Sequence, residues 1–156
     1  MSLLPSLPPK RNHRYTSRNQ ALQSAIKVWA CKNCITWHTP KKPETCTHCG
    51  FTEFYYFASK FEAKRYGELK LQQTIGHITE LRTQITYPLT VNTILICKYI
   101  ADFQYKDLAG NLIVEDTKGS EAAVTEVFKL KRKLMGAIHG IDVKPIYQSK
   151  GKGRKK

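Results

Sequence analysis

Two aspartates and a lysine lie on two strand-like segments of this chain that a short loop connects. Asp102 lies within residues 99–105, and Asp116 and Lys118 lie within residues 112–118. The loop between the segments is rich in turn-forming residues, so the pair is predicted to form an antiparallel hairpin. Because side chains alternate along a strand, Asp116 and Lys118 should share one face of it.

The register of this hairpin would bring the two carboxylates together. The simplest register places three pairs opposite one another: Lys106 and Leu112, Asp102 and Asp116, and Ile100 and Lys118. Opposed Cβ atoms are only about 5 Å apart, and like charges there repel, so a carboxylate pair is a candidate divalent-metal site. Lys118 could orient or deprotonate an attacking water, or neutralise charge on a phosphate. The alternative is an ordinary exposed hairpin face.

Four of the five cysteines form two CxxC pairs, Cys31 with Cys34 and Cys46 with Cys49. Each pair can place two thiolates on one metal ion, and residues 35–45 are long enough to bring the pairs together around zinc. Four protein ligands close the coordination sphere, so the spacing predicts a structural zinc and not a catalytic one. Two disulfides are the alternative, which the lack of an export signal disfavours.

The formal net charge of +14 is concentrated toward the two ends of the chain. Residues 1–30 have five basic and no acidic side chains, residues 144–156 have six and none, and residues 51–143 carry a net charge of only +1. Basic segments poor in apolar residues stay flexible and bind polyphosphates by releasing counterions, which indicates a nucleic-acid partner. A charged tail that only keeps the protein in solution is the alternative.

Residues 59–73 are predicted to form a helix whose start has two interpretations. Ser59 and Glu62 match the capping-box pattern, so Glu62 is either a site residue or a cap of its own helix. Further elements are predicted at residues 81–89 and 91–100 (strands), 122–139 (a helix that Gly140 ends) and 141–147 (a closing strand). The order indicates an α+β body.

The second helix has an apolar and a basic side. The positions expected to face the core are Val127, Leu130, Leu134, Ala137 and Ile138, and those on the basic side are Lys129, Arg132 and Lys133. The basic side is a candidate surface for DNA phosphates. The composition divides the chain into a flexible basic arm (1–28), a zinc ribbon (29–55), the α+β body (56–147) and a basic tail (148–156).

No apolar run is long enough to span a membrane. Residues 1–10 have leucines broken by prolines and lack the apolar core of a signal peptide. We therefore expect a cytosolic protein with no membrane partner.

With these elements placed, residues 59–147 resemble the PD-(D/E)XK nuclease superfamily. The similar order of parts is a helix with Glu62, a strand with Asp102, a hairpin leading to Asp116 and Lys118, and then a helix. Ala101 stands where the superfamily motif has proline. Glu115 beside Asp116 leaves two candidates for the second acid, of which strand parity with Lys118 favours Asp116.

Within that superfamily, two phage groups are similar to this chain. The endonuclease I group, which resolves Holliday junctions, has a like acid-Thr-Lys-Gly segment, here residues 116–119. A second phage-encoded family is similar in three patterns, here at residues 59–66, 101–103 and 114–119. The N-terminal zinc ribbon is no part of endonuclease I.

The resemblance implies a restriction-endonuclease-like α/β fold, with a central mixed sheet flanked by helices, and cleavage of DNA phosphodiesters with Mg²⁺ or Mn²⁺. By this likeness Asp102 and Asp116 would hold the catalytic metal with the carbonyl of Thr117, and Lys118 would act on the water. Glu62 would bind a second ion or position the nucleophile. It also implies a phage protein in the host cytosol.

The sequence thus predicts a metal-dependent, structure-selective endodeoxyribonuclease that resolves Holliday junctions or other branched phage DNA during recombination. Two cuts on one junction need two sites, so a homodimer is expected. Two alternatives stay open. One is a non-catalytic zinc-ribbon regulator that binds nucleic acid, and the other is a nicking or repair nuclease that acts on plain duplex DNA.

Overall fold

The computed structural model describes residues 26–148, so most of the predicted basic arm and tail lies outside the described residues. Within residues 26–148 the fold is α+β, with a small three-stranded sheet, a mixed four-stranded sheet and two helices. Its elements are β1 (Val28–Cys31), β2 (Trp37–His38), β3 (Phe54–Phe57), α2 (Lys60–Thr74), β4 (Thr79–Val91), β5 (Ile94–Lys106), β6 (Leu112–Lys118), the 3₁₀ turn η1 (Glu121–Ala123), α3 (Glu126–His139) and β7 (Val143–Tyr147). None of the described helices is long and apolar enough to cross a membrane.

The four-stranded sheet has the order β4-β5-β6-β7. Its first three strands are antiparallel, and β7 lies parallel to β6 after the crossover through α3. The strands predicted at 91–100 and 99–105 form one 13-residue strand, β5. Pro88 does not interrupt β4, because β4 lies at the sheet edge, where a missing N–H is tolerated.

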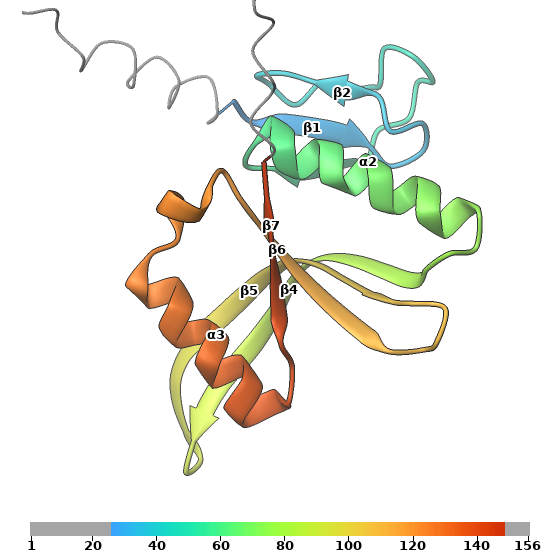
Figure 1. The fold of residues 1–156 in the computed structure, drawn as a ribbon. Coiled ribbons are helices and arrows are strands. Elements are labelled where there is room, and N and C mark those ends of the chain that lie inside the picture. The colour runs from blue at the N-terminus through green and yellow to red at the C-terminus, as the bar shows by residue number, and fades with distance from the viewer. Residues whose placement is uncertain (1–25, 149–156) are drawn as a thin grey trace, which may run out of the picture.

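Helix α2 lies between the small sheet and the rest of the molecule (Figure 1). Ser59 caps it by accepting a hydrogen bond from the Glu62 backbone N–H, as the capping-box pattern predicts. The buried side of α2 packs on residues of both sheets, in a core cluster made of Val28, Ala30, Phe57, Ala63, Tyr66, Leu69, Ile78, Phe103 and Tyr105. The ribbon therefore shares its core with the body, and the predicted boundary at residues 55/56 falls inside β3.

Helix α3 covers the other end of the sheet (Figure 1) and ends at Gly140, whose φ of 68° is left-handed, as predicted. Its core-facing positions match the prediction only in part: Leu134 and Ile138 are partly buried against the core, but Ala137 is exposed. Phe128 and Met135 are buried, whereas Val127 and Leu130 are 63% and 59% exposed. The helix begins only after Thr125, and its rotation places Phe128 against Tyr99 of β5. The second core cluster comprises Leu89, Tyr99, Ala101, Val114, Phe128, Met135 and Val143.

Candidate functional site

Asp116 and Lys118 lie side by side on β6, as strand parity predicts. Asp116 is 6% exposed, and its Oδ2 accepts hydrogen bonds from Lys118 Nζ at 2.7 Å and from the Tyr99 hydroxyl at 2.9 Å. Lys118 Nζ also lies 4.3 Å from the centroid of the Phe128 ring. The carboxylate and the ammonium are thus held in place by β5 and α3 as well as by their own strand.

Asp102 lies where the strand pairing stops. The β5–β6 ladder runs from Lys106–Leu112 to Phe103–Glu115, so the predicted register is right but the predicted pairs of Asp102 with Asp116 and Ile100 with Lys118 do not form. The Asp102 carboxylate instead accepts hydrogen bonds from the Thr117 backbone N–H and hydroxyl, both at 2.7 Å. This side-chain contact replaces the backbone pairing that would have continued the ladder.

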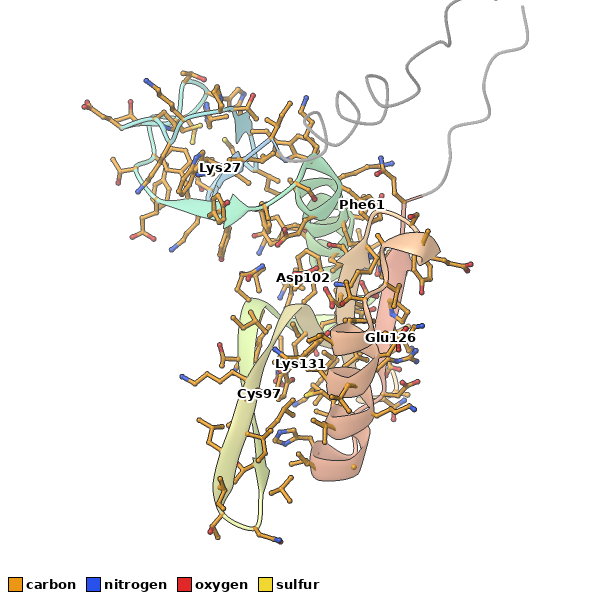
Figure 2. All side chains as sticks on the ribbon, turned by 90° about the vertical axis from the view of Figure 1, so that its left-hand side faces the viewer. Lys27, Phe61, Cys97, Asp102, Glu126 and Lys131 are labelled. Carbon is orange, nitrogen blue, oxygen red and sulfur yellow. The ribbon has the colours of Figure 1, made fainter. Side chains whose placement is uncertain are left out.

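The pairing of β5 with β4 is also interrupted at Asp102. The register passes from Thr83–Phe103 to Ile85–Ala101, and Gln84, between them, has a left-handed φ of 54°. Asp102 is therefore unpaired in both flanking ladders, at the midpoint of the molecule between α2 and the β4–β5 hairpin (Figure 2). Irregular strand positions of this kind often aim side chains at a site.

Glu62 lies at the start of α2 and close to the two aspartates. Its Oε2 accepts a hydrogen bond from the Ala58 N–H at 3.0 Å, so it does cap its helix, and its Oε1 accepts one from Gln84 Nε2 at 2.6 Å. The side chain is 4% exposed, and its burial, followed by the negative charge of Asp102, raises its pKa to about 7. Glu62 therefore caps α2 while facing the aspartates.

The site holds more negative than positive charge in a poorly hydrated position. Burial and the nearby charge of Asp116 raise the pKa of Asp102 to about 6, although the Thr117 hydrogen bonds oppose the shift. Lys118 forms an ion pair with Asp116, and none of the ion pairs within residues 26–148 involves Glu62 or Asp102. The donors are hard oxygens, which suit Mg²⁺ or Mn²⁺, and an added cation would relieve the repulsion. Among the residues that the structure describes, the four cysteines are the one group of three or more possible ligands close enough to hold a metal ion, and the three carboxylates do not form such a group.

Glu115 lies on the opposite side of β6 from this site. It is 2% exposed and accepts hydrogen bonds from Arg65 Nε and Nη2, both at 2.8 Å, and from the Tyr105 hydroxyl at 2.6 Å. Glu115 thus joins β6 to α2, and the choice of Asp116 as the second acid agrees with this geometry. Sequence reasoning missed the contacts of Tyr99 and Gln84, for which no local pattern gives a signal.

Replacing Arg65 with alanine should cost about 3–5 kcal/mol of unfolding free energy, because it leaves a buried carboxylate without its cation. Denaturant unfolding measures this loss. The matched control is Lys32→Ala, which breaks the exposed Lys32–Glu53 pair of 2.8 Å and should cost at most about 1 kcal/mol. Equal losses in the two variants would contradict the importance of the buried pair.

The stability of the metal-free protein should fall as the pH rises from about 4 to about 8. The pKa values of Glu62 and Asp102 are raised on folding, so the folded state binds more protons than the unfolded state across this window. Glu62 alone should contribute on the order of 3 kcal/mol. Glu62→Gln keeps the capping acceptor and should flatten the dependence, as measured by urea unfolding at each pH. A slope unchanged in that variant would contradict the assignment.

The four paired cysteines form a compact cluster that could bind zinc. Their Sγ atoms all lie within 4.8 Å of one another, with 3.6 Å between Cys31 and Cys49 and 3.5 Å between Cys34 and Cys46. Four Zn–S bonds of about 2.3 Å at tetrahedral angles require Sγ atoms about 3.8 Å apart. All five cysteines of the chain are free thiols, so the predicted disulfide alternative is not formed.

The two CxxC turns have the same backbone geometry. The N–H of Ile35 donates to the carbonyl of Cys31, and the N–H of Gly50 donates in the same way to Cys46. Ile35 and Gly50 both have left-handed φ angles, of 63° and 73°. Two equivalent turns that each present a pair of thiolates are what a tetrahedral site needs, because each supplies half of the ligands.

The three basic residues predicted on α3 do lie together on its solvent side. Lys129 forms an ion pair with Glu126 at 2.7 Å, and Arg132 forms one with Asp142 at 2.8 Å. Together with Lys133 they border an open cavity of about 630 Å³. Phe128 lines this cavity and also contacts Lys118, so the basic surface adjoins the acidic site.

One family model matches this chain, over residues 51–153, which is about two thirds of its length. Its description is "Protein of unknown function (DUF1064)". The chain belongs to the DUF1064 family. The match includes Glu62, Asp102, Asp116 and Lys118 but none of the four clustered cysteines, so the acidic site lies in the family domain and the candidate zinc site lies before it. Comparisons with curated proteins and with solved structures found no match.

Proposed function

We propose that this protein is a metal-dependent endodeoxyribonuclease with a restriction-endonuclease-like arrangement of its catalytic residues. The observation that carries the proposal is the convergence of Glu62, Asp102, Asp116 and Lys118, from three separate elements, at the point where β5 leaves its partner strands. The excess of buried negative charge there suits a divalent cation. The element order and the mixed sheet are consistent with the resemblance to PD-(D/E)XK nucleases.

Asp102 and Asp116 would hold Mg²⁺ or Mn²⁺, with Glu62 and the Thr117 carbonyl as further oxygen donors. When bound, such an ion polarises the scissile phosphate and lowers the pKa of water. Lys118, fixed 2.7 Å from Asp116, would orient the attacking water and stabilise charge on the phosphate oxygens. The water oxygen would bond to phosphorus as the bond to the 3′ oxygen breaks. The water proton would pass to solvent, and the departing 3′ oxygen would take up a proton from solvent.

Branched DNA is the substrate that the surface and the resemblance favour. Lys129, Arg132 and Lys133 present cations that can contact backbone phosphates without reading base edges, which suits recognition by shape. The strongly basic chain ends, at residues 1–30 and 144–156, would add affinity of the salt-dependent kind. The four cysteines would hold a structural zinc that braces the small sheet.

The proposal is tested by incubating the purified protein with a four-way junction, a nicked duplex and a linear duplex of the same sequence, with and without Mg²⁺. Scission that needs Mg²⁺ and favours the junction is the expected result. Equal cutting of all three DNAs would support the plain-duplex nuclease instead. DNA binding without scission in any divalent metal would overturn the nuclease proposal and would favour the non-catalytic zinc-ribbon regulator.

A homodimer is proposed from the distal end of the β4–β5 hairpin. Val91, Ile94, Leu95 and Ile96 are 43–65% exposed there, beyond the end of α3 (Figure 1). The β4 edge has no further strand beside it in the described sheet, so the same segment of a second copy could pair with it or cover its apolar side chains.

Light scattering after size exclusion should find a dimer for the wild type and a monomer for Ile96→Lys, because the new charge would be buried without a partner. Leu108→Lys is the control, because Leu108 is 78% exposed in the loop between β5 and β6. This variant should stay dimeric. A monomeric wild type at micromolar concentration would refute this interface.

A further inference from the structure

The cavity beside α3 has the chemistry of a nucleotide site. It is about 630 Å³ in volume, within the range of ligand pockets, and lies between η1, α3 and the end of β7. Its lining residues are Glu121, Val124, Phe128, Lys129, Arg132, Lys133, Gly136, Asp142 and Tyr147. It thus combines apolar and aromatic surface with a basic side.

Tyr147 supplies the aromatic surface that a base could stack on. Its side chain is 38% exposed at the cavity wall, whereas Phe128 is only 9% exposed. Gly136 also lines the cavity, and a Cβ added there would meet only the Ile141 carbonyl, at 4.0 Å, so the helix leaves space on that side. A partly exposed aromatic ring at the wall of a cavity is the kind of platform that single-strand binding proteins use for stacking.

The charges of the lining favour a phosphate at one side of the cavity. Arg132 is held by Asp142, which fixes the position of its guanidinium, and Lys129 is held by Glu126. Lys133 is exposed, and none of the ion pairs among residues 26–148 involves it. Its charge is therefore free to pair with an anion. Glu121 lines the same cavity, and its negative charge disfavours a ligand that carries negative charge along its whole length.

The cavity and the acidic site share a wall. Lys118 Nζ lies 4.3 Å from the Phe128 ring and 2.7 Å from Asp116 Oδ2, and Phe128 lines the cavity. Tyr147 is the β7 partner of Lys118 in the strand register. A nucleotide in the cavity would therefore lie next to any phosphate held at the acidic site.

We propose that this cavity binds one unpaired base of the DNA strand that is cut, with the base on Tyr147 and the adjoining phosphate near Lys133. The proposal rests on the proposed nuclease function and sharpens it, since the enzyme would select DNA with an unpaired nucleotide at the branch. A fully paired duplex offers no base to the cavity, so it would bind only through its phosphates.

Binding is measured without Mg²⁺, by fluorescence of a 2-aminopurine base placed either in a three-nucleotide bulge or within the same duplex fully paired. The wild type should bind the bulged DNA about tenfold more tightly, in line with one base stacked. Tyr147→Ala and the cavity-filling Gly136→Leu should each remove most of that preference and leave affinity for the paired duplex unchanged. Val127→Ala, exposed on the same helix outside the cavity, is the control.

Equal affinity of the wild type for both DNAs, or a preference that survives in both cavity variants, would overturn the inference. Unchanged affinity of both variants for the paired duplex excludes misfolding as the cause. The nuclease proposal fails separately, by an absence of scission in Mg²⁺ while the binding preference persists.

Discussion

Asp116→Asn is expected to lower the rate of Mg²⁺-dependent DNA scission by about a thousandfold, or about 4 kcal/mol of transition-state stabilisation. Asparagine has the same shape and can still accept the hydrogen bond from the Tyr99 hydroxyl, so the site should keep its packing. The variant loses the negative charge that holds both Lys118 and the proposed cation. Single-turnover cleavage of a four-way junction measures the effect.

The control for this prediction is Asp107→Asn on the same hairpin. Asp107 closes its own loop by accepting hydrogen bonds from the Ala109 and Asn111 N–H groups. Its substitution should therefore leave the cleavage rate unchanged. Loss of the Asp116 charge also removes one source of the raised pKa of Asp102, so that pKa should fall in the metal-free variant. Wild-type activity in Asp116→Asn would remove Asp116 from the site.

Removal of the zinc that we propose at the four cysteines should unfold more than the ribbon. Zinc binding contributes on the order of 10 kcal/mol to small domains that depend on it. Here Val28, Ala30 and Phe57 of the ribbon strands belong to the core that holds α2. Loss of the metal should therefore loosen α2, and with it Glu62, so that both the melting temperature and DNA cleavage fall.

A zinc-selective chelator and Cys46→Ser should each lower the melting temperature by more than about 10 °C, as followed by circular dichroism. Cys97→Ser is the matched control, because Cys97 is the one cysteine outside the cluster and should change little. Metal analysis should find one zinc per chain in the wild type. An unchanged melting temperature after complete zinc removal would show that the ribbon folds without it.

Elements specified by nearby residues were predictable. The Ser59 cap, the Gly140 stop and the Lys106–Leu112 register depend on contacts a few residues apart. The four-cysteine cluster follows from two turns of fixed spacing. The orientation of α3 was not predictable, since both sides of the helix offer apolar residues at helical spacing and only packing against Tyr99 selects Phe128.

By itself the sequence determined which residue types were available for chemistry, namely two acids and a lysine on a hairpin and four thiols in two turns. Tertiary structure alone decided that Glu62 faces the aspartates, that Glu115 turns away to Arg65, and that the ribbon shares a core with α2. The physical reason is range. Turns, caps and hairpin registers are selected by local geometry, whereas burial and the charge repulsion that marks this site depend on which distant segments pack together.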